Sequence, residues 1–204
     1  MVLNLAMGAL GYLMEKDDYN PDTDLKKINK DSKKFKISIV LALIEHGSVV
    51  ALAIILFIVF STYSIILGII WVICRTGEGL IQFYNEPSYW RLIKISRQYS
   101  RVSSTEKNSL SKLAITIFKA KDRRFKYAMI LWAIGTFAFS IVLVTSGVVP
   151  QIIGWLGIVT SFLIGFGNGT KLLKPKFNVP IISALMAITF EVIIGGWLVY
   201  YSII

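Results

Sequence analysis

Residues 37–60 read ISIVLALIEHGSVVALAIILFIVF, an apolar run whose only ionisable side chains are Glu45 and His46. A helix needs about 20 apolar residues to cross a hydrocarbon layer of about 30 Å, so this run is long enough for one crossing. After the uncharged tetrapeptide STYS at 61–64, a second apolar run extends to about Phe83. A connection this short predicts that the two runs form an antiparallel pair of membrane-spanning helices.

Three further apolar runs follow, at about 127–144, 152–166 and 180–204. The sequence therefore predicts an all-α, polytopic transmembrane helical bundle with five full spans over residues 37–204. Residues 1–14 are also apolar, but as a helix they would reach only about 21 Å. They form half a span, an interfacial segment or part of a first span. The 55% apolar and 17% charged content excludes an ordinary soluble domain as the default.

The charged residues lie in three polar connections. Of the 22 basic residues, all but Arg75 fall in segments 15–36, 85–126 and 170–178, whereas the turns at 61–64 and 145–151 have no charge. Basic loops stay on the cytoplasmic side of a membrane. We therefore expect a multi-pass protein of the cell membrane, with these three segments as cytoplasmic loops and the C-terminus external. The basic loops would attract anionic lipids, and no nucleic-acid motif accompanies them.

Within the basic segment 85–126, apolar residues recur with helical spacing at Leu110, Leu113, Ala114, Ile117 and Phe118. This pattern predicts an amphipathic helix. Two interpretations remain open, because such a helix can lie along an anionic leaflet or pack against the rest of the bundle.

Five ionisable residues fall inside the predicted spans and form the candidate site: Glu45, His46, Arg75, Glu78 and Glu191. A charge at the centre of a membrane helix costs about 2.5 kcal/mol or more, so such groups usually face the bundle interior and have partners. At 1.5 Å per residue, the four charged groups lie at overlapping depths of about 9 to 17 Å from the cytoplasmic ends of their spans.

The spacing of Arg75 and Glu78 places them on one face of a helix, where they can form an ion pair. Arg75 has further donors for a second carboxylate, so it is the natural centre of a cluster with Glu45 and Glu191. Such a cluster beside His46 suits a proton path or a cation site, or it serves only to fix helix packing. Because His46 follows Glu45 directly, its side chain points about 100° away and need not belong to the cluster.

The sequence shows no pattern for other site chemistry. His46 has no second histidine or cysteine at metal-ligand spacing, and Cys74 is the single cysteine. No nucleophile motif and no phosphate-binding loop is present. We therefore assign no catalytic, cofactor-binding or metal-binding residue.

Several segments together resemble a family of bacterial and archaeal multi-span membrane proteins catalogued only as a domain of unknown function. The matching pieces are ILGIIWVICRTGEGLI with its R-x-x-E-G arrangement, SGVVPQIIGWLGIVTS, FEVIIGGWLVYYS, and Glu45 in LALIE. The resemblance implies a bundle of about six spans with polar positions at Glu45, Arg75, Glu78 and Glu191. It implies no activity.

Three functions are consistent with these features. The first is a non-catalytic accessory protein, sensor or small-ligand-binding bundle, which could assemble with another membrane protein or with copies of itself. The alternative is a proton-coupled, ion or small-molecule transporter that uses the buried Glu/Arg cluster. An intramembrane enzyme with Glu45 and His46 as its acid–base pair is the third.

Overall fold

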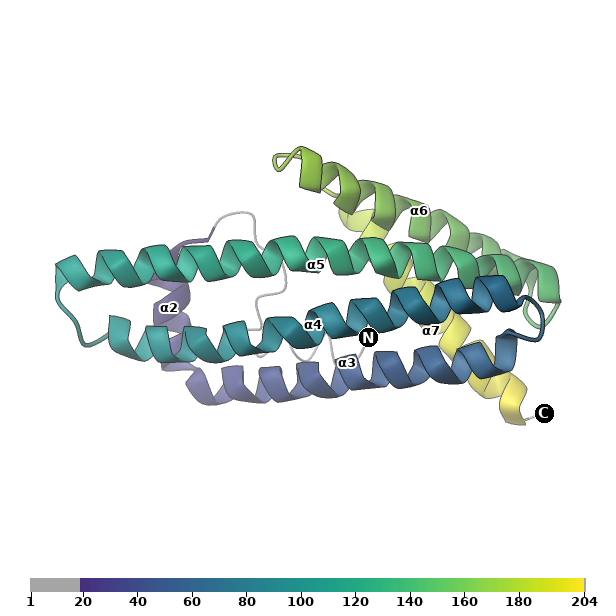
Figure 1. Cartoon of the computed structure of the whole chain (residues 1–204), viewed down its shortest axis with the longest axis horizontal. Helices are drawn as coiled ribbons and strands as arrows, with labels where there is room; N and C mark the ends of the chain where they lie inside the picture. The colour runs from purple at the N-terminus through teal and green to yellow at the C-terminus, as the bar shows by residue number, and fades with distance from the viewer. Residues whose placement is uncertain (1–18, 204) are drawn as a thin grey trace. The chain divides into compact units, whose positions relative to one another are not determined.

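The computed structural model describes residues 19–203, and the short apolar segment 1–14 lies outside them. The described part contains six helices and no strand (Figure 1). The helices are α2 (Pro21–Lys30), α3 (Ser32–Phe60), α4 (Ile65–Tyr99), α5 (Ser104–Ser146), α6 (Gln151–Leu173) and α7 (Ile181–Ile203). Helices α3 to α7 are each long and apolar enough to cross a membrane. The prediction of an all-α bundle with five spans is therefore confirmed.

The described residues divide into two compact units that share the three longest helices. We call residues 19–47 and 81–125 the basic unit, because they hold most of the lysines and arginines of the chain. Residues 48–80 and 126–203 form the apolar unit. Each unit has its own hydrophobic core, and each is described separately below.

The basic unit has a helix where a loop was expected. In the described part of segment 15–36, residues 19–36, the structure has α2 and the start of α3. Asn20 caps α2 by accepting hydrogen bonds from the backbone N–H groups of Asp22 and Thr23, and Pro21 occupies the first helical turn. Acidic residues lie in the first turn of α2 and lysines in its last turn. These charges interact favourably with the helix dipole and stabilise the helix. The charges of this predicted cytoplasmic loop thus also stabilise a short helix.

Segment 85–126 is also mainly helical, because α4 extends to Tyr99 and α5 begins at Ser104. These extensions pack with α2 and α3 around a core of Leu25, Ile28, Phe35, Ile39, Ala42, Tyr89, Leu92, Ile93, Ile95, Tyr99, Ala114 and Phe118. In the amphipathic stretch of α5, Ala114 and Phe118 are fully buried in this core, whereas Leu113 is exposed. Its apolar face therefore packs against the bundle, as the second interpretation proposed.

Three cation–π contacts join α4 to α5 in the basic unit. Arg124 lies over Tyr84, Lys121 over Tyr89 and Lys107 over Tyr99, at 4.7 to 5.7 Å from the ring centroids. From Tyr84 to Tyr99 along α4, the basic partner on α5 moves in the opposite direction, from Arg124 back to Lys107. The contacts therefore fix an antiparallel register between the two helices.

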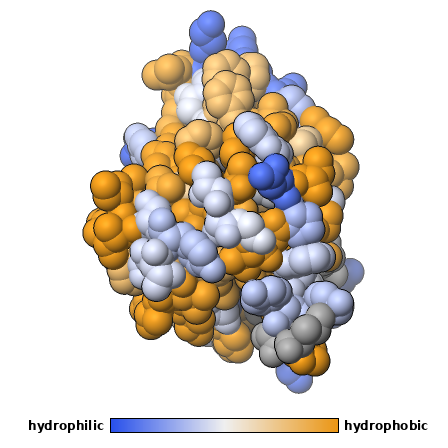
Figure 2. Space-filling view, turned by 90° about the vertical axis from the view of Figure 1, so that its right-hand side faces the viewer, coloured by the Kyte–Doolittle hydropathy of each residue, from blue (hydrophilic) through white to orange (hydrophobic). Residues whose placement is uncertain are grey.

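The apolar unit contains the remaining parts of α3, α4 and α5 together with α6 and α7. Its main core is made of Leu56, Phe60, Trp71, Phe139, Val142, Leu143, Val149, Ile153, Phe190 and Ile194. Helices α5 and α6 are joined by the predicted turn at 145–151, in which Gly147 adopts a positive φ of 72°. Seen from the right-hand end of Figure 1, apolar side chains are interspersed with polar ones (Figure 2).

Close approach of α5 and α6 depends on two glycines. A Cβ at Gly157 would lie 2.2 Å from Ser140 Oγ and 2.6 Å from the Phe190 ring, and one at Gly154 would lie 2.5 Å from Val144. Real Cβ atoms do not approach other atoms so closely. Gly154 and Gly157 therefore form a surface of α6 on which other helices pack closely.

Candidate functional site

In the apolar unit, Arg75 is the centre of a buried network on α4. Its Nη1 donates to Glu78 Oε2 at 2.6 Å, one turn further along the same helix. The guanidinium carbon lies 5.4 Å from the ring centroid of Trp71 and 5.9 Å from that of Trp132. The charge is thus neutralised by one carboxylate and flanked by two aromatic rings, which compensates part of the cost of burying it.

The sequence provides room for this arginine on the neighbouring helix. A Cβ at Gly135 of α5 would lie 3.3 Å from Arg75 Cγ and 3.2 Å from Cys74 Cβ. The aliphatic stem of Arg75 therefore packs directly against the α5 backbone. The orientation of Trp71 is fixed separately, because its indole Nε1 donates to the Ala53 carbonyl at 3.1 Å.

Glu191 of α7 joins this network through an aromatic side chain. Trp132 Nε1 of α5 donates to Glu191 Oε1 at 3.2 Å, while the Trp132 ring contacts the Arg75 guanidinium. Arg75 and Glu78 of α4, Trp132 of α5 and Glu191 of α7 therefore form one group, which we call the Arg75 network. It links three helices of the apolar unit.

In the basic unit, His46 lies between two carboxylates. Its Nδ1 is 2.9 Å from Glu45 Oε2 on the same helix, and its Nε2 is 3.3 Å from Glu86 Oε1 on α4. His46 and Glu86 are buried, and Glu45 is partly exposed. A histidine with a carboxylate at each nitrogen fits the protonated ring, in which both nitrogens carry a hydrogen. We call these three residues the His46 triad.

The surroundings of the His46 triad are partly aromatic. The Phe83 ring meets the His46 ring edge-on, with 5.7 Å between centroids. A Cβ at Gly47 would lie 3.9 Å from Phe83 Cζ, an ordinary van der Waals distance, so the α3 backbone passes near this ring without close packing. Pro87 follows Glu86 inside α4, and without a backbone N–H it cannot donate the helical hydrogen bond at this level.

The five residues predicted from sequence thus belong to two groups of contacts. Arg75, Glu78 and Glu191 lie in the Arg75 network of the apolar unit, whereas Glu45 and His46 lie in the triad of the basic unit. The expected ion pair between Arg75 and Glu78 is present. Although adjacent residues diverge on a helix, the His46 ring still reaches the Glu45 carboxylate.

Sequence reasoning missed Glu86, Trp71 and Trp132. Glu86 falls in the segment 85–126, which the sequence predicts to be a basic cytoplasmic loop. Its spacing of eight residues from Glu78 would place both on one side of a continuous helix, and this was the available signal. The two tryptophans appeared only as apolar residues of their spans, and nothing in their spacing identifies them as partners of Arg75.

The two groups of residues combine carboxylates with an imidazole or a guanidinium, and such side chains can exchange protons or fix helix packing. Among residues 19–203, no cluster of three or more histidine, cysteine, aspartate or glutamate side chains has the arrangement to hold a metal ion. In the His46 triad, both ring nitrogens are already engaged by carboxylates.

Comparison with known proteins identifies a family. The family model described as "Domain of unknown function (DUF4386)" matches residues 2–201. No curated protein and no solved structure matches the chain.

Proposed function

The chain belongs to the DUF4386 family of unknown function, and we propose that it is a non-catalytic membrane protein that responds to protons. It would act as a sensor or as an accessory subunit. That it is an integral membrane protein follows from its five long apolar helices. The proton response is our proposal.

The observation that carries this proposal is the position of His46 between Glu45 and Glu86. A protonated imidazole donates to both carboxylates, whereas a neutral ring has a single N–H and can donate to one. Loss of the proton therefore removes one of two hydrogen bonds. When the bond to Glu86 is lost, α3 and α4 lose a buried polar contact in the basic unit.

Ionisable and aromatic groups approach His46 from two helices. Glu45 approaches from α3 and Glu86 from α4, while Phe83 adds an apolar edge. On α5, Lys121 lies over Tyr89, which is one helical turn beyond Glu86. Only a ring that carries both hydrogens can donate to Glu45 and Glu86 at once, so the contact between α3 and α4 depends on the protonation state of His46.

The same geometry favours a sensor over an enzyme. An acid–base catalyst must reach a proton of its substrate with a free nitrogen or oxygen. In the triad, both nitrogens of the buried His46 ring point at carboxylate oxygens. This arrangement supports a non-catalytic role for the pair Glu45 and His46.

The main competing function is proton-coupled or small-molecule transport that uses the five ionisable residues of the predicted spans. A transporter and a sensor differ in net flux. Proteoliposomes with an imposed pH gradient separate them, because a sensor gives the leak rate of empty vesicles. A flux that Glu45→Gln abolishes would favour transport.

The proton response itself is tested by amide hydrogen exchange on the protein in lipid nanodiscs. Exchange in segments 41–50 and 82–90 is followed at acidic and alkaline pH, after correction for the pH dependence of chemical exchange. A hydrogen bond to a charged group contributes about 1.5 to 3 kcal/mol, so its loss should speed local opening roughly tenfold to a hundredfold. NMR of labelled histidine reports the protonation directly, because His46 is the only histidine in the chain.

Two variants complete this experiment. His46→Gln should remove the pH dependence, because glutamine does not titrate in this range. Glu191→Gln changes a partly buried carboxylate in the other unit and should keep the response of the wild type. An equal response in wild type and His46→Gln would refute the proposal.

A further inference from the structure

The basic unit has an uneven outer surface. On α3, Ile37, Val40 and Ile44 follow one another at helical spacing with 46%, 47% and 53% of their surface exposed. At the N-terminal end of this stripe, Lys33 and Lys34 are exposed as well. One face of α3 thus combines an apolar stripe with cationic groups at its end.

Helix α2 adds further lysines beside this end and is held in a defined position. Its Leu25 and Ile28 are buried in the core of the basic unit, and Asn29 Nδ2 donates to Ser100 Oγ at 3.0 Å. Tyr99 donates a hydrogen bond from its hydroxyl to Asp22. With its apolar side buried, α2 exposes Lys26, Lys27 and Lys30. These side chains are therefore presented by a packed helix.

We propose that α2 and the start of α3 bind anionic phospholipids of the adjacent leaflet. The phosphate groups would contact a lysine platform, defined as Lys26, Lys27, Lys30, Lys33 and Lys34. The acyl chains would lie along Ile37, Val40 and Ile44. Asp31 is the single acidic residue between Lys26 and Lys34, so the platform keeps a clear excess of positive charge.

The match to a lipid rests on both parts of the surface. A soluble anion needs only the lysines, whereas an amphiphile uses an apolar stripe and cations at one end of it. Lysine stems reach along apolar surface and place the ammonium group at the level of the headgroups. Each basic residue near an anionic leaflet adds attraction that falls off within a Debye length.

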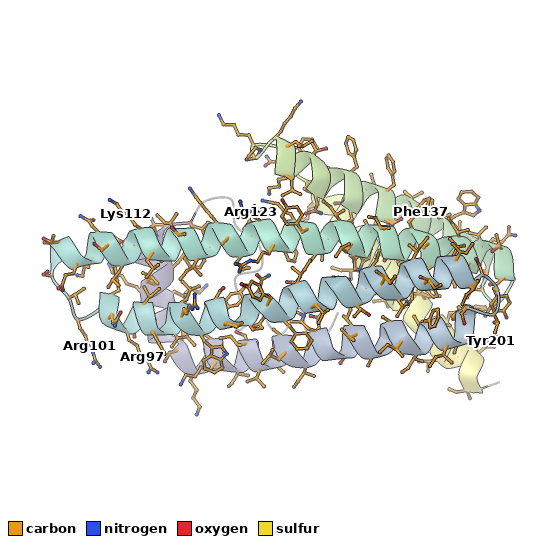
Figure 3. All side chains as sticks on the ribbon, viewed as in Figure 1. Arg97, Arg101, Lys112, Arg123, Phe137 and Tyr201 are labelled. Carbon is orange, nitrogen blue, oxygen red and sulfur yellow. The ribbon has the colours of Figure 1, made fainter. Side chains whose placement is uncertain are left out.

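Other exposed bases of the same unit provide a control. Lys112, Lys119 and Arg123 share one face of α5, where Thr116 and not an apolar stripe lies between them. In Figure 3, the side chains of Lys112, of Arg97 near the end of α4 and of Arg101 in the following connection point away from the ribbon. Removing three bases from α5 changes the net charge of the protein as much as removing three from the lysine platform.

The test uses the full chain in vesicles of phosphatidylcholine with a small fraction of photoactivatable lipid. The reactive group is in the acyl chain, and the headgroup is either phosphatidylglycerol or phosphatidylcholine. Mass spectrometry then locates and quantifies the labelled residues. In the wild type, we expect phosphatidylglycerol to label residues 37–44 more strongly than phosphatidylcholine does.

The triple variant Lys30→Gln, Lys33→Gln and Lys34→Gln should lower labelling by phosphatidylglycerol at 37–44 by about fivefold or more. A single lysine near an anionic surface already contributes about this factor. Labelling by phosphatidylcholine should stay the same. The control variant Lys112→Gln, Lys119→Gln and Arg123→Gln should retain the wild-type pattern. Equal labelling by the two lipids in the wild type, or an equal decrease in both variants, would overturn the proposal.

Discussion

Trp132 and Glu191 are joined by a hydrogen bond of 3.2 Å from the indole Nε1 to a carboxylate oxygen, although they lie 59 residues apart. This bond links α5 to α7, and the same indole ring lies over the Arg75 guanidinium. A second indole anchors α7 near the 145–151 turn, because Trp197 Nε1 donates to the Val148 carbonyl at 3.2 Å. Helix α7 therefore depends on polar contacts as well as on apolar packing.

The first prediction concerns this bond. Trp132→Phe keeps an aromatic ring beside Arg75 but removes the donor to Glu191, and hydrogen bonds to charged groups contribute about 1.5 to 3 kcal/mol. We expect a lower midpoint in thermal unfolding of the detergent-solubilised protein. Trp90→Phe is the control, because Trp90 lies exposed on α4. The prediction fails when the two variants unfold at the same temperature.

The second prediction concerns the Arg75 network. Arg75→Met leaves the buried Glu78 carboxylate without its ion-pair partner, and breaking a buried pair in this way costs about 3 to 5 kcal/mol. The double variant Arg75→Met with Glu78→Gln has no buried charge at this position, so it should recover most of the loss. Thermal unfolding measures both. A double variant no more stable than the single one would show that the arginine acts through packing alone.

The third prediction concerns the packing of α6 against α5. Gly157→Ala would place a methyl group against Ser140 and Phe190, and such overpacking costs about 1 to 3 kcal/mol. Gly169→Ala on the same helix has open space around the new Cβ and replaces glycine by a better helix former. We expect Gly157→Ala to lower the unfolding temperature and Gly169→Ala to preserve or raise it. The reverse order would contradict the packing described for α6.

The fourth prediction distinguishes a packed α2 from a solvated loop. Leu25 is fully buried in the core of the basic unit, so Leu25→Ala should cost about 2 to 5 kcal/mol. The neighbouring Lys26 is exposed, and Lys26→Ala should be close to neutral. Limited proteolysis between residues 19 and 36 provides the readout, because a loosened helix is cut faster. Equal cutting rates in the two variants would mean that α2 does not depend on this core.

The site was predictable in part. Arg75 and Glu78 are three residues apart on one helix, so their ion pair follows from spacing alone. The contact between His46 and Glu86 spans 40 residues and depends on how α3 and α4 are aligned along each other. No local sequence pattern predicts how the two helices are aligned. The same holds for Trp132, whose partner lies on α7.

What the sequence determined by itself is the set of spans, because the length and apolarity of a segment are local properties. They can be compared directly with the thickness of a bilayer. It also determined which residues carry charge within those spans. Only the tertiary structure decided which of them meet, because contacts between helices depend on register, rotation and close approach at glycines. It likewise showed that charged segments such as 15–36 contain packed helices, since a charged sequence can have one buried apolar side.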